Sequence, residues 1–131
     1  MNMRECDLYK KEKNGLRCLA CAHKCLIEKE NTGICGVRKN INDKLYLLVY
    51  GKVASMNVDP IEKKPLYQFL PGTNVFSIGT VGCNFKCGFC QNFEISQASK
   101  GRAIIGKEIT PEQIVERAIE TGCKSIAYTY N

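Results

Sequence analysis

Two short apolar runs in the first half of the chain predict a β-hairpin. The first, residues 45–50, is rich in strand-forming residues and follows the turn-forming pair Asn42-Asp43. The dipeptide Gly51-Lys52 separates it from the second run, residues 53–58. Two strand-like runs joined by so short a connection are typical of a hairpin. Residues 1–17, in contrast, are highly charged and show no apolar pattern.

The second half of the chain predicts two strands with a helix between them. Residues 74–80 are short, apolar and bounded by glycine, as in a buried strand. A helical pattern begins near residue 110, and residues 125–130 form a second strand-like run. This order predicts a βαβ unit with a parallel strand pair and a right-handed crossover.

The predicted helix carries clear signals at both ends. Thr110 is suited to the N-cap, Pro111 to the first helical position, and Gln113 completes a capping box. Gly122 is placed to end the helix. An apolar stripe along one face is expected from Ile114, Val115, Ala118 and Ile119. Cys123, just after the helix, is expected to be a small buried residue.

Composition favours a globular protein with ordinary surface charge. The 131 residues are 44% hydrophobic and 24% charged, with a net charge of +6. The basic residues are dispersed and form no run interleaved with aromatic residues, so no nucleic-acid partner is expected. No apolar run approaches the ~18–20 residues that span a bilayer, so no membrane partner is expected either.

Nine cysteines are many for this length, and their grouping indicates metal binding. Their number is odd, and most lie in two clusters with spacings of two or three residues. The N-terminus is polar and lacks the apolar stretch of a secretory signal. We therefore expect reduced cysteines that ligate metal, in a cytoplasmic protein.

The most informative motif is Cys83-Asn-Phe-Lys-Cys87-Gly-Phe-Cys90, with the spacing C-x3-C-x2-C. Three thiolates in one loop can bind three irons of a [4Fe–4S] cluster and leave the fourth iron open to a substrate. A zinc site would need a fourth ligand, which is absent nearby. Glycines at 79, 82 and 88 suit a backbone that packs closely around a bulky group.

A second set of cysteines precedes it, with the spacing C-x2-C-x3-C-x9-C: Cys18, Cys21, Cys25 and Cys35. Four thiolates would close the shell of a zinc ion, which favours zinc over an auxiliary iron–sulfur cluster, although spacing alone does not decide between them. Reduced cysteines without metal remain the third interpretation. His23 could replace a cysteine as a ligand, but a position at the surface or beside the ligands is favoured, and Cys6 is expected to be an ordinary free thiol.

The triad and its surroundings resemble the radical S-adenosylmethionine (SAM) enzymes. Phe89 before the last cysteine completes the C-x3-C-x-aromatic-C pattern of that superfamily. The flanking sequence resembles one subfamily, the AmmeMemoRadiSam-system radical SAM enzymes, in residues 60–66, 77–85 and 90–97. Members of this subfamily are often described as related to pyruvate formate-lyase activating enzyme. The resemblance runs from about Cys18 to the last residue.

The resemblance implies a fold class and a division of the chain. The fold would be α/β, the N-terminal portion of a radical SAM (partial TIM-like) barrel. Residues 1–40 would form a Cys-rich metal-binding module, residues 41–72 a β-hairpin with its connecting loop, and residues 73–131 the start of the barrel.

The resemblance also implies the cofactors and the chemistry. Cys83, Cys87 and Cys90 would hold the [4Fe–4S] cluster, and SAM would bind its open iron and yield a 5′-deoxyadenosyl radical that abstracts hydrogen from a substrate. Phe89 would lie near the adenine, and the SAM side of the site would be lined by Thr129, Tyr130 and Asn131. The expected partners are SAM and an electron donor such as a flavodoxin or ferredoxin, and a protein substrate is a further candidate partner.

Other functions remain open. Within the same superfamily, the chain could belong to an activase that installs a glycyl radical on a partner protein. From different classes, it could be an iron–sulfur electron carrier or a zinc-stabilised binding module. In the loop at residues 60–66, Lys63 and Lys64 could face phosphate or an acidic substrate, although a solvated loop is the default.

The chain's last residues suggest a partial barrel. Residues 126–131 resemble a subfamily phrase that continues into Glu-Pro, and this chain stops one residue before the glutamate. A complete (β/α) barrel takes ~200 residues or more. We therefore expect a truncated or partial chain, with the substrate-binding residues outside it.

Overall fold

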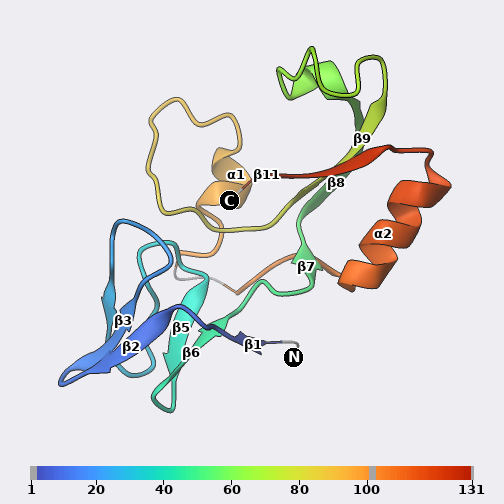
Figure 1. The fold of residues 1–131 in the computed structure, drawn as a ribbon. Helices are drawn as coiled ribbons and strands as arrows, with labels where there is room; N and C mark the ends of the chain where they lie inside the picture. Colours follow the sequence, from blue (N-terminus) through green and yellow to red (C-terminus); the bar gives the residue numbers. More distant parts are fainter. Residues whose placement is uncertain (1–2, 101–102, 131) are drawn as a thin grey trace. The chain divides into compact units, whose positions relative to one another are not determined.

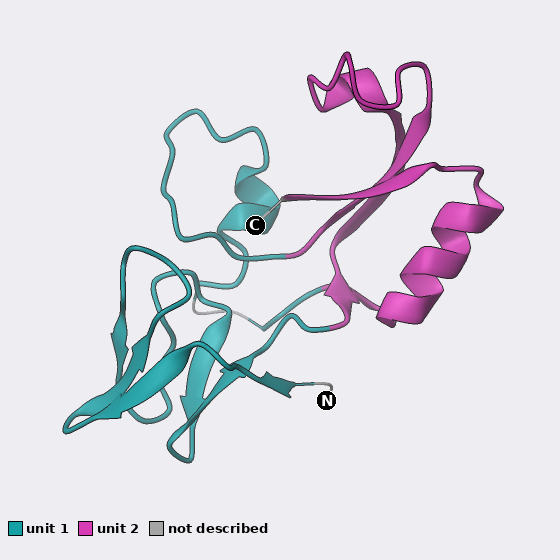
Figure 2. Ribbon diagram, viewed as in Figure 1, with its two compact units in different colours: residues 1–50, 81–105 teal, residues 51–80, 106–131 magenta. Residues whose placement is uncertain are grey.

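The computed structural model describes residues 3–100 and 103–130 and divides the chain into two compact units (Figures 1 and 2). The first unit comprises Met1–Tyr50 and Val81–Ile105, and the second comprises Gly51–Thr80 and Gly106–Asn131. The boundaries expected at residues 40 and 72 fall inside these units. The triad loop therefore belongs to the same unit as the Cys-rich N-terminal segment.

The first unit contains two three-stranded antiparallel sheets and one short helix. The order of one sheet is β2-β3-β4, formed by Tyr9–Glu12, Gly15–Cys18 and Leu26–Ile27. The order of the other is β1-β6-β5, formed by Arg4–Glu5, Lys44–Leu47 and Arg38–Ile41. The helix α1 spans Phe93–Ser96.

The hairpin expected between residues 45–50 and 53–58 is not formed. Instead, β6 pairs with the preceding strand β5 through the two-residue turn Asn42-Asp43. Both turn residues have positive φ angles, 50° and 60°, as in the type I′ turns that match the twist of a hairpin. The turn residues were recognised in the sequence, but the strand before them was not.

The core of the first unit lies between its short strands. Leu16, Ile27 and Leu45 are almost completely buried, and Cys18 packs with them. Asn40 is also fully buried, and its Nδ2 donates a hydrogen bond to the Ile27 carbonyl oxygen at 2.9 Å. This bond satisfies the buried Nδ2, although no partner is seen among the described residues for the buried Oδ1, and it links β5 to β4 at a defined register.

The second unit combines a mixed sheet, a short ladder and a helix. The order of the sheet is β11-β9-β8, formed by Ser125–Tyr130, Asn74–Gly79 and Ser55–Pro60. The ladder joins β7 (Lys52–Val53) to β10 (Lys107–Glu108), the 3-10 helix η1 spans Ile61–Lys63, and α2 spans Pro111–Glu120.

The predicted helix and the two predicted strands are confirmed. The strand β9 pairs in parallel with β11, and α2 lies between them in sequence. Thr110 caps α2, and its side chain and that of Gln113 form the expected capping box. The apolar stripe is narrower than expected: Ile114 and Ala118 are buried, but Val115 and Ile119 are 48% and 70% exposed.

The expected fold class, an α/β chain that forms the start of a TIM-like barrel, is wrong. The described residues contain more strand than helix, and the strands form several small sheets whose pairings are antiparallel except for that of β9 with β11. The second edge of β9 is taken by β8, which runs antiparallel to it over six residues. The expected hairpin of residues 45–50 with 53–58 would instead place β8 beside residues 45–50, which is not observed.

The helices in the described part of the chain are short, and none has the length and apolar character needed to cross a membrane.

Candidate metal centre

The triad lies in a loop of the first unit that has no regular secondary structure. Residues 80–92 contain no helix or strand. Cys83 and Cys90 are partly buried, whereas Cys87 is exposed. The Cys90 N–H donates to the Cys87 carbonyl oxygen at 3.3 Å, so the last two cysteines bracket a tight turn.

Two of the three sulfur atoms have polar partners within the loop and α1. The backbone N–H of Phe85 donates to Cys83 Sγ at 3.5 Å. The Ser96 hydroxyl lies 3.5 Å from Cys90 Sγ. Hydrogen bonds to sulfur stabilise thiolates and tune the clusters that they bind. Ser96, which the sequence analysis did not single out, therefore becomes a candidate supporting residue.

The segment around α1 fixes both sides of the loop. The backbone N–H of Gly82 donates to the Ile95 carbonyl oxygen at 3.0 Å, just before Cys83. The Gln97 side-chain amide donates to the Phe85 carbonyl oxygen at 3.2 Å. These contacts hold the loop at two points while the turn that carries Cys87 remains exposed.

The Cys-rich N-terminal segment also contacts this region directly. His23 Nε2 lies 2.8 Å from the Asn84 carbonyl oxygen, next to Cys83. Because a carbonyl oxygen only accepts, Nε2 carries the proton. Ser99 Oγ donates to the Cys35 carbonyl oxygen at 3.2 Å. These pairs lie more than 60 residues apart in sequence, so no local spacing could reveal them.

Gly82 sits at the tightest point of this packing. Its φ angle is +91°, and a Cβ there would overlap a Val37 methyl group and lie 2.8 Å from the Cys35 carbonyl oxygen. We predict that Gly82→Ala lowers the free energy of unfolding by about 2–3 kcal/mol, through backbone strain and overpacking. Gly88→Ala is the control because Gly88 has open space around it and no left-handed φ angle. Chemical denaturation checks both variants, and equal stability of the two would contradict this account.

The His23 contact predicts a measurable effect on the triad loop. His23→Ala removes one exposed hydrogen bond, worth about 1 kcal/mol, so tryptic cleavage at the exposed Lys86 should accelerate about fivefold. His23→Gln retains an amide donor and should restore most of the protection. If both variants are cleaved at the parent rate, the contact does not hold the loop.

The four N-terminal cysteines lie in different surroundings. Cys18 is buried in the core, and Cys25 packs partly against the same cluster. Cys6, which was expected to stand alone, also packs against this cluster. Cys21 and Cys35 are partly buried elsewhere in the unit, and the Cys35 backbone contacts Ser99.

The described residues contain no group of three or more Cys, His, Asp or Glu side chains gathered closely enough to hold a metal ion. This applies to the triad and to the N-terminal set. The donor chemistry of the triad nevertheless suits an iron–sulfur cluster, since three thiols occur within eight residues and two have hydrogen-bond partners. Metal binding at either set stays a prediction.

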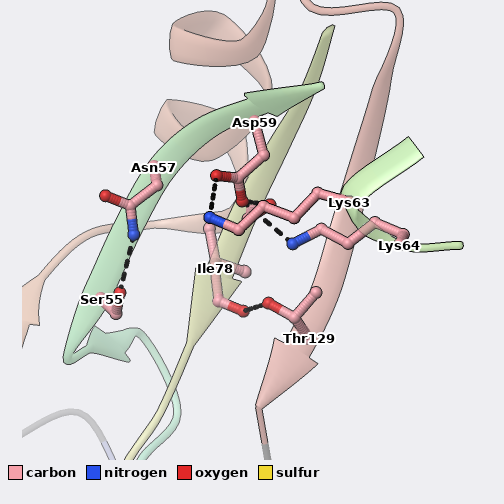
Figure 3. A network of polar contacts seen from close by, with 8 residues as sticks. Ser55, Asn57, Asp59, Lys63, Lys64, Ile78 and Thr129 are labelled. Carbon is pink, nitrogen blue, oxygen red and sulfur yellow. Dashed lines mark hydrogen bonds and ion pairs between the residues drawn. The ribbon is translucent and has the colours of Figure 1, made fainter. Parts of the chain in front are cut away.

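The residues expected to contact SAM fall in different units. Phe89 belongs to the first unit, and its ring is 88% exposed. Thr129 belongs to the second unit, at a register shift between β11 and β9, and its hydroxyl donates to the Ile78 carbonyl oxygen at 3.1 Å (Figure 3). The Tyr130 side chain and all of Asn131 lie outside the described residues. Their expected roles stay predictions.

The lysines after β8 bind an internal carboxylate. Lys63 Nζ and Lys64 Nζ contact the two carboxylate oxygens of Asp59 at 2.8 and 3.0 Å (Figure 3). Ser77 Oγ donates to one of these oxygens at 2.7 Å. The hydrogen bond from Lys63, followed by that from Ser77, holds the pKa of Asp59 well below its ordinary value. The lysine charges are thus compensated in part, which weakens the case for a phosphate site here.

Comparison with known proteins identifies one relative by sequence. The chain is 49% identical, over 129 residues, to a protein of Methanocaldococcus jannaschii called "Uncharacterized protein MJ0808". The match covers 98% of this chain but 38% of the relative, so the chain spans less than half the length of the curated relative that it matches. No protein-family model matches the chain. No solved structure matches it either.

Proposed function

We propose that this chain binds a [4Fe–4S] cluster through Cys83, Cys87 and Cys90 and forms part of a radical SAM enzyme. The observation that carries the proposal is the set of three closely spaced thiols, with hydrogen-bond partners at Cys83 and Cys90. When bound, the cluster would supply an electron for the reductive cleavage of SAM to methionine and a 5′-deoxyadenosyl radical.

The chain's own residues would have three tasks at this centre. The three thiols would ligate iron as thiolates, with no fourth protein ligand in the loop. The Phe85 N–H and the Ser96 hydroxyl would donate to the sulfur atoms. His23 and Gln97 would fix the backbone between Cys83 and Cys87 through the carbonyl oxygens of Asn84 and Phe85.

The solvent exposure of the outer part of the loop supports a site with a coordination position open to a ligand, rather than a purely structural metal site. Cys87, Phe89 and the intervening glycine are all exposed, so the outer turn of the loop can approach a ligand. A structural site is usually closed by four protein ligands. The activity of the whole protein, its substrate and its electron donor remain part of the same proposal.

The test is the response of the reconstituted, dithionite-reduced chain to SAM, followed by electron paramagnetic resonance. We expect SAM to change the spectrum of the reduced cluster because its amino and carboxylate groups would ligate the open iron. Adenosine, which lacks the methionine part of SAM and therefore its α-amino and carboxylate groups, is the control and should leave the spectrum unchanged. A spectrum that is the same with and without SAM would favour an electron carrier instead.

A further inference from the structure

A cavity in the first unit combines two arginines with an apolar floor. Its volume is about 330 Å³, and it lies among the N-terminal strands and the segments that flank them. The cavity is lined by Arg4, Arg38, Leu47 and Tyr50, together with Cys6. None of these residues belongs to the triad loop, so the cavity is separate from the proposed cluster site.

The strand register explains why the two arginines share this cavity. Arg4 on β1 and Arg38 on β5 both pair with the same residue of the central strand, Leu47 on β6. Directly opposed residues of antiparallel strands project from the same face of a sheet. Because neighbouring strands lie about 4.8 Å apart, the arginines emerge about 10 Å from each other, one on each side of Leu47.

Both guanidinium groups lack the carboxylate partners that usually neutralise arginine. Within residues 3–100 and 103–130, neither Arg4 nor Arg38 takes part in an ion pair. The Arg4 guanidinium lies over the Tyr50 ring, 5.2 Å from its centroid, which orients it without cancelling its charge. Arg38 faces the Cys6 thiol, whose pKa is raised by burial against the opposing effect of this arginine.

The carboxylates at the cavity leave a positive balance. Glu5 accepts hydrogen bonds from Lys44 Nζ and Tyr9 Oη, both at 2.9 Å, so it is already compensated. The remaining lining carboxylate is the exposed Asp7. The cavity lining therefore carries two positive guanidinium groups, one on each side of Leu47, and one carboxylate, that of Asp7, without a cationic partner among the described residues.

We propose that this cavity binds a small organic anion with an apolar or aromatic body. Both arginines would hold its carboxylate or phosphate group, since the planar guanidinium fork matches such oxygens. The body would lie on Leu47 and against Tyr50. This requirement for both parts distinguishes the site from a surface that attracts any anion.

Four probes separate the contributions of charge and body. Benzoate and phenyl phosphate carry both parts, inorganic phosphate carries the charge alone, and benzamide carries the body without the charge. We expect the two aromatic anions to shift the amide resonance of Leu47 saturably in a ¹H–¹⁵N titration. Inorganic phosphate and benzamide should each bind roughly tenfold more weakly or not at all.

Variants locate the site. Arg4→Gln and Arg38→Gln should each weaken binding of the better aromatic anion roughly tenfold, because each removes a charge-assisted hydrogen bond. Lys13→Gln removes the same charge from an exposed residue outside the cavity lining and should leave the affinity unchanged. Arg4 lies on an exposed edge strand, so its substitution tests the site even if Arg38→Gln disturbs the fold.

Cys6 provides an independent readout of occupancy. Its alkylation by iodoacetamide, followed by peptide mass spectrometry, should slow in the presence of the bound anion, whereas that of Cys123 in the other unit should not. The proposal is overturned if benzamide binds as well as benzoate, if Lys13→Gln weakens binding as much as Arg4→Gln, or if none of the probes shifts Leu47 saturably.

Discussion

Replacing Cys87 with serine should abolish the visible absorbance of the cluster that the parent chain acquires on anaerobic reconstitution with iron and sulfide. Thiolates are the ligands that hold iron–sulfur clusters, and a serine hydroxyl stays protonated near neutral pH. Because Cys87 is exposed, this substitution should leave the fold intact. Its effect would then report ligation alone.

Cys123→Ser is the matched control for this experiment. Cys123 is also a free cysteine, but it packs partly against the core of the second unit, and its sulfur lies 3.3 Å from Thr121 Oγ1. We expect this variant to acquire the same absorbance as the parent chain. Circular dichroism of both variants before reconstitution would show that they are folded. If Cys87→Ser and Cys123→Ser both reconstitute like the parent, the triad is not the ligand set.

Asp59→Ala should lower the free energy of unfolding by about 3–5 kcal/mol. The Asp59 side chain is 7% exposed and binds Lys63 and Lys64 (Figure 3), and it also accepts a hydrogen bond from Ser77. Lys64 is itself 13% exposed, and Ser77 is fully buried, so truncation leaves a poorly solvated ammonium group and a buried hydroxyl without their shared acceptor. Leaving one member of a buried charge pair unpaired is much more costly than losing a surface ion pair.

Glu116→Ala is the control for Asp59→Ala. It removes a carboxylate from the same unit, but Glu116 is exposed on α2. We expect its effect to stay within about 0.5 kcal/mol. Urea denaturation of the parent chain and both variants measures the difference. A cost for Asp59→Ala no larger than that for Glu116→Ala would show that the Asp59 network contributes little to stability.

The same carboxylate predicts how stability depends on pH. The folded-state pKa of Asp59 is depressed, chiefly by the hydrogen bond from Lys63, so its stabilising effect is fully present above its unfolded-state pKa of about 3.9. Stability should therefore fall as the pH drops below about 4. Asp59→Asn, which cannot titrate, should show a shallower loss over that range. An unchanged acid slope would contradict the depressed pKa.

The parts of the fold that the sequence predicts are those with strong local signals. The start of α2 follows from Thr110, Pro111 and Gln113, whose side chains and backbone act within one turn of the chain. The strands β9 and β11 are apolar runs of the expected length, and they pair in parallel as predicted. In both cases the information lies within a few residues.

The pairings that the sequence missed depend on distant residues or on a polar strand. The strand β5 reads Arg-Lys-Asn-Ile, which has no strand-like pattern, and yet Asn40 within it is fully buried because its amide reaches the Ile27 carbonyl oxygen. Without β5, the neighbouring run was assigned to the wrong partner. The expectation of a barrel came from the resemblance to radical SAM enzymes, and a parallel barrel has no place for the antiparallel pairing of β8 with β9.

The features of the candidate site likewise fall into local ones, which the sequence predicts, and long-range ones, which it does not. The spacing of Cys83, Cys87 and Cys90 is local and was evident at once. The contact of His23 with the Asn84 carbonyl oxygen spans 61 residues and involves a backbone atom, so residue types alone carry no sign of it. The same is true of the cavity flanked by Arg4 and Arg38, which arises from the register of three strands.

The most direct test of the central claim is the iron and acid-labile sulfide content of the reconstituted protein. The parent chain is compared with the triple variant Cys83→Ser, Cys87→Ser, Cys90→Ser after anaerobic reconstitution and desalting. Our account predicts a loss of about four irons and four sulfides per chain in the triple variant, as expected for one [4Fe–4S] cluster. Equal iron and sulfide in the two proteins, or a parent chain that retains zinc and no sulfide, would contradict it.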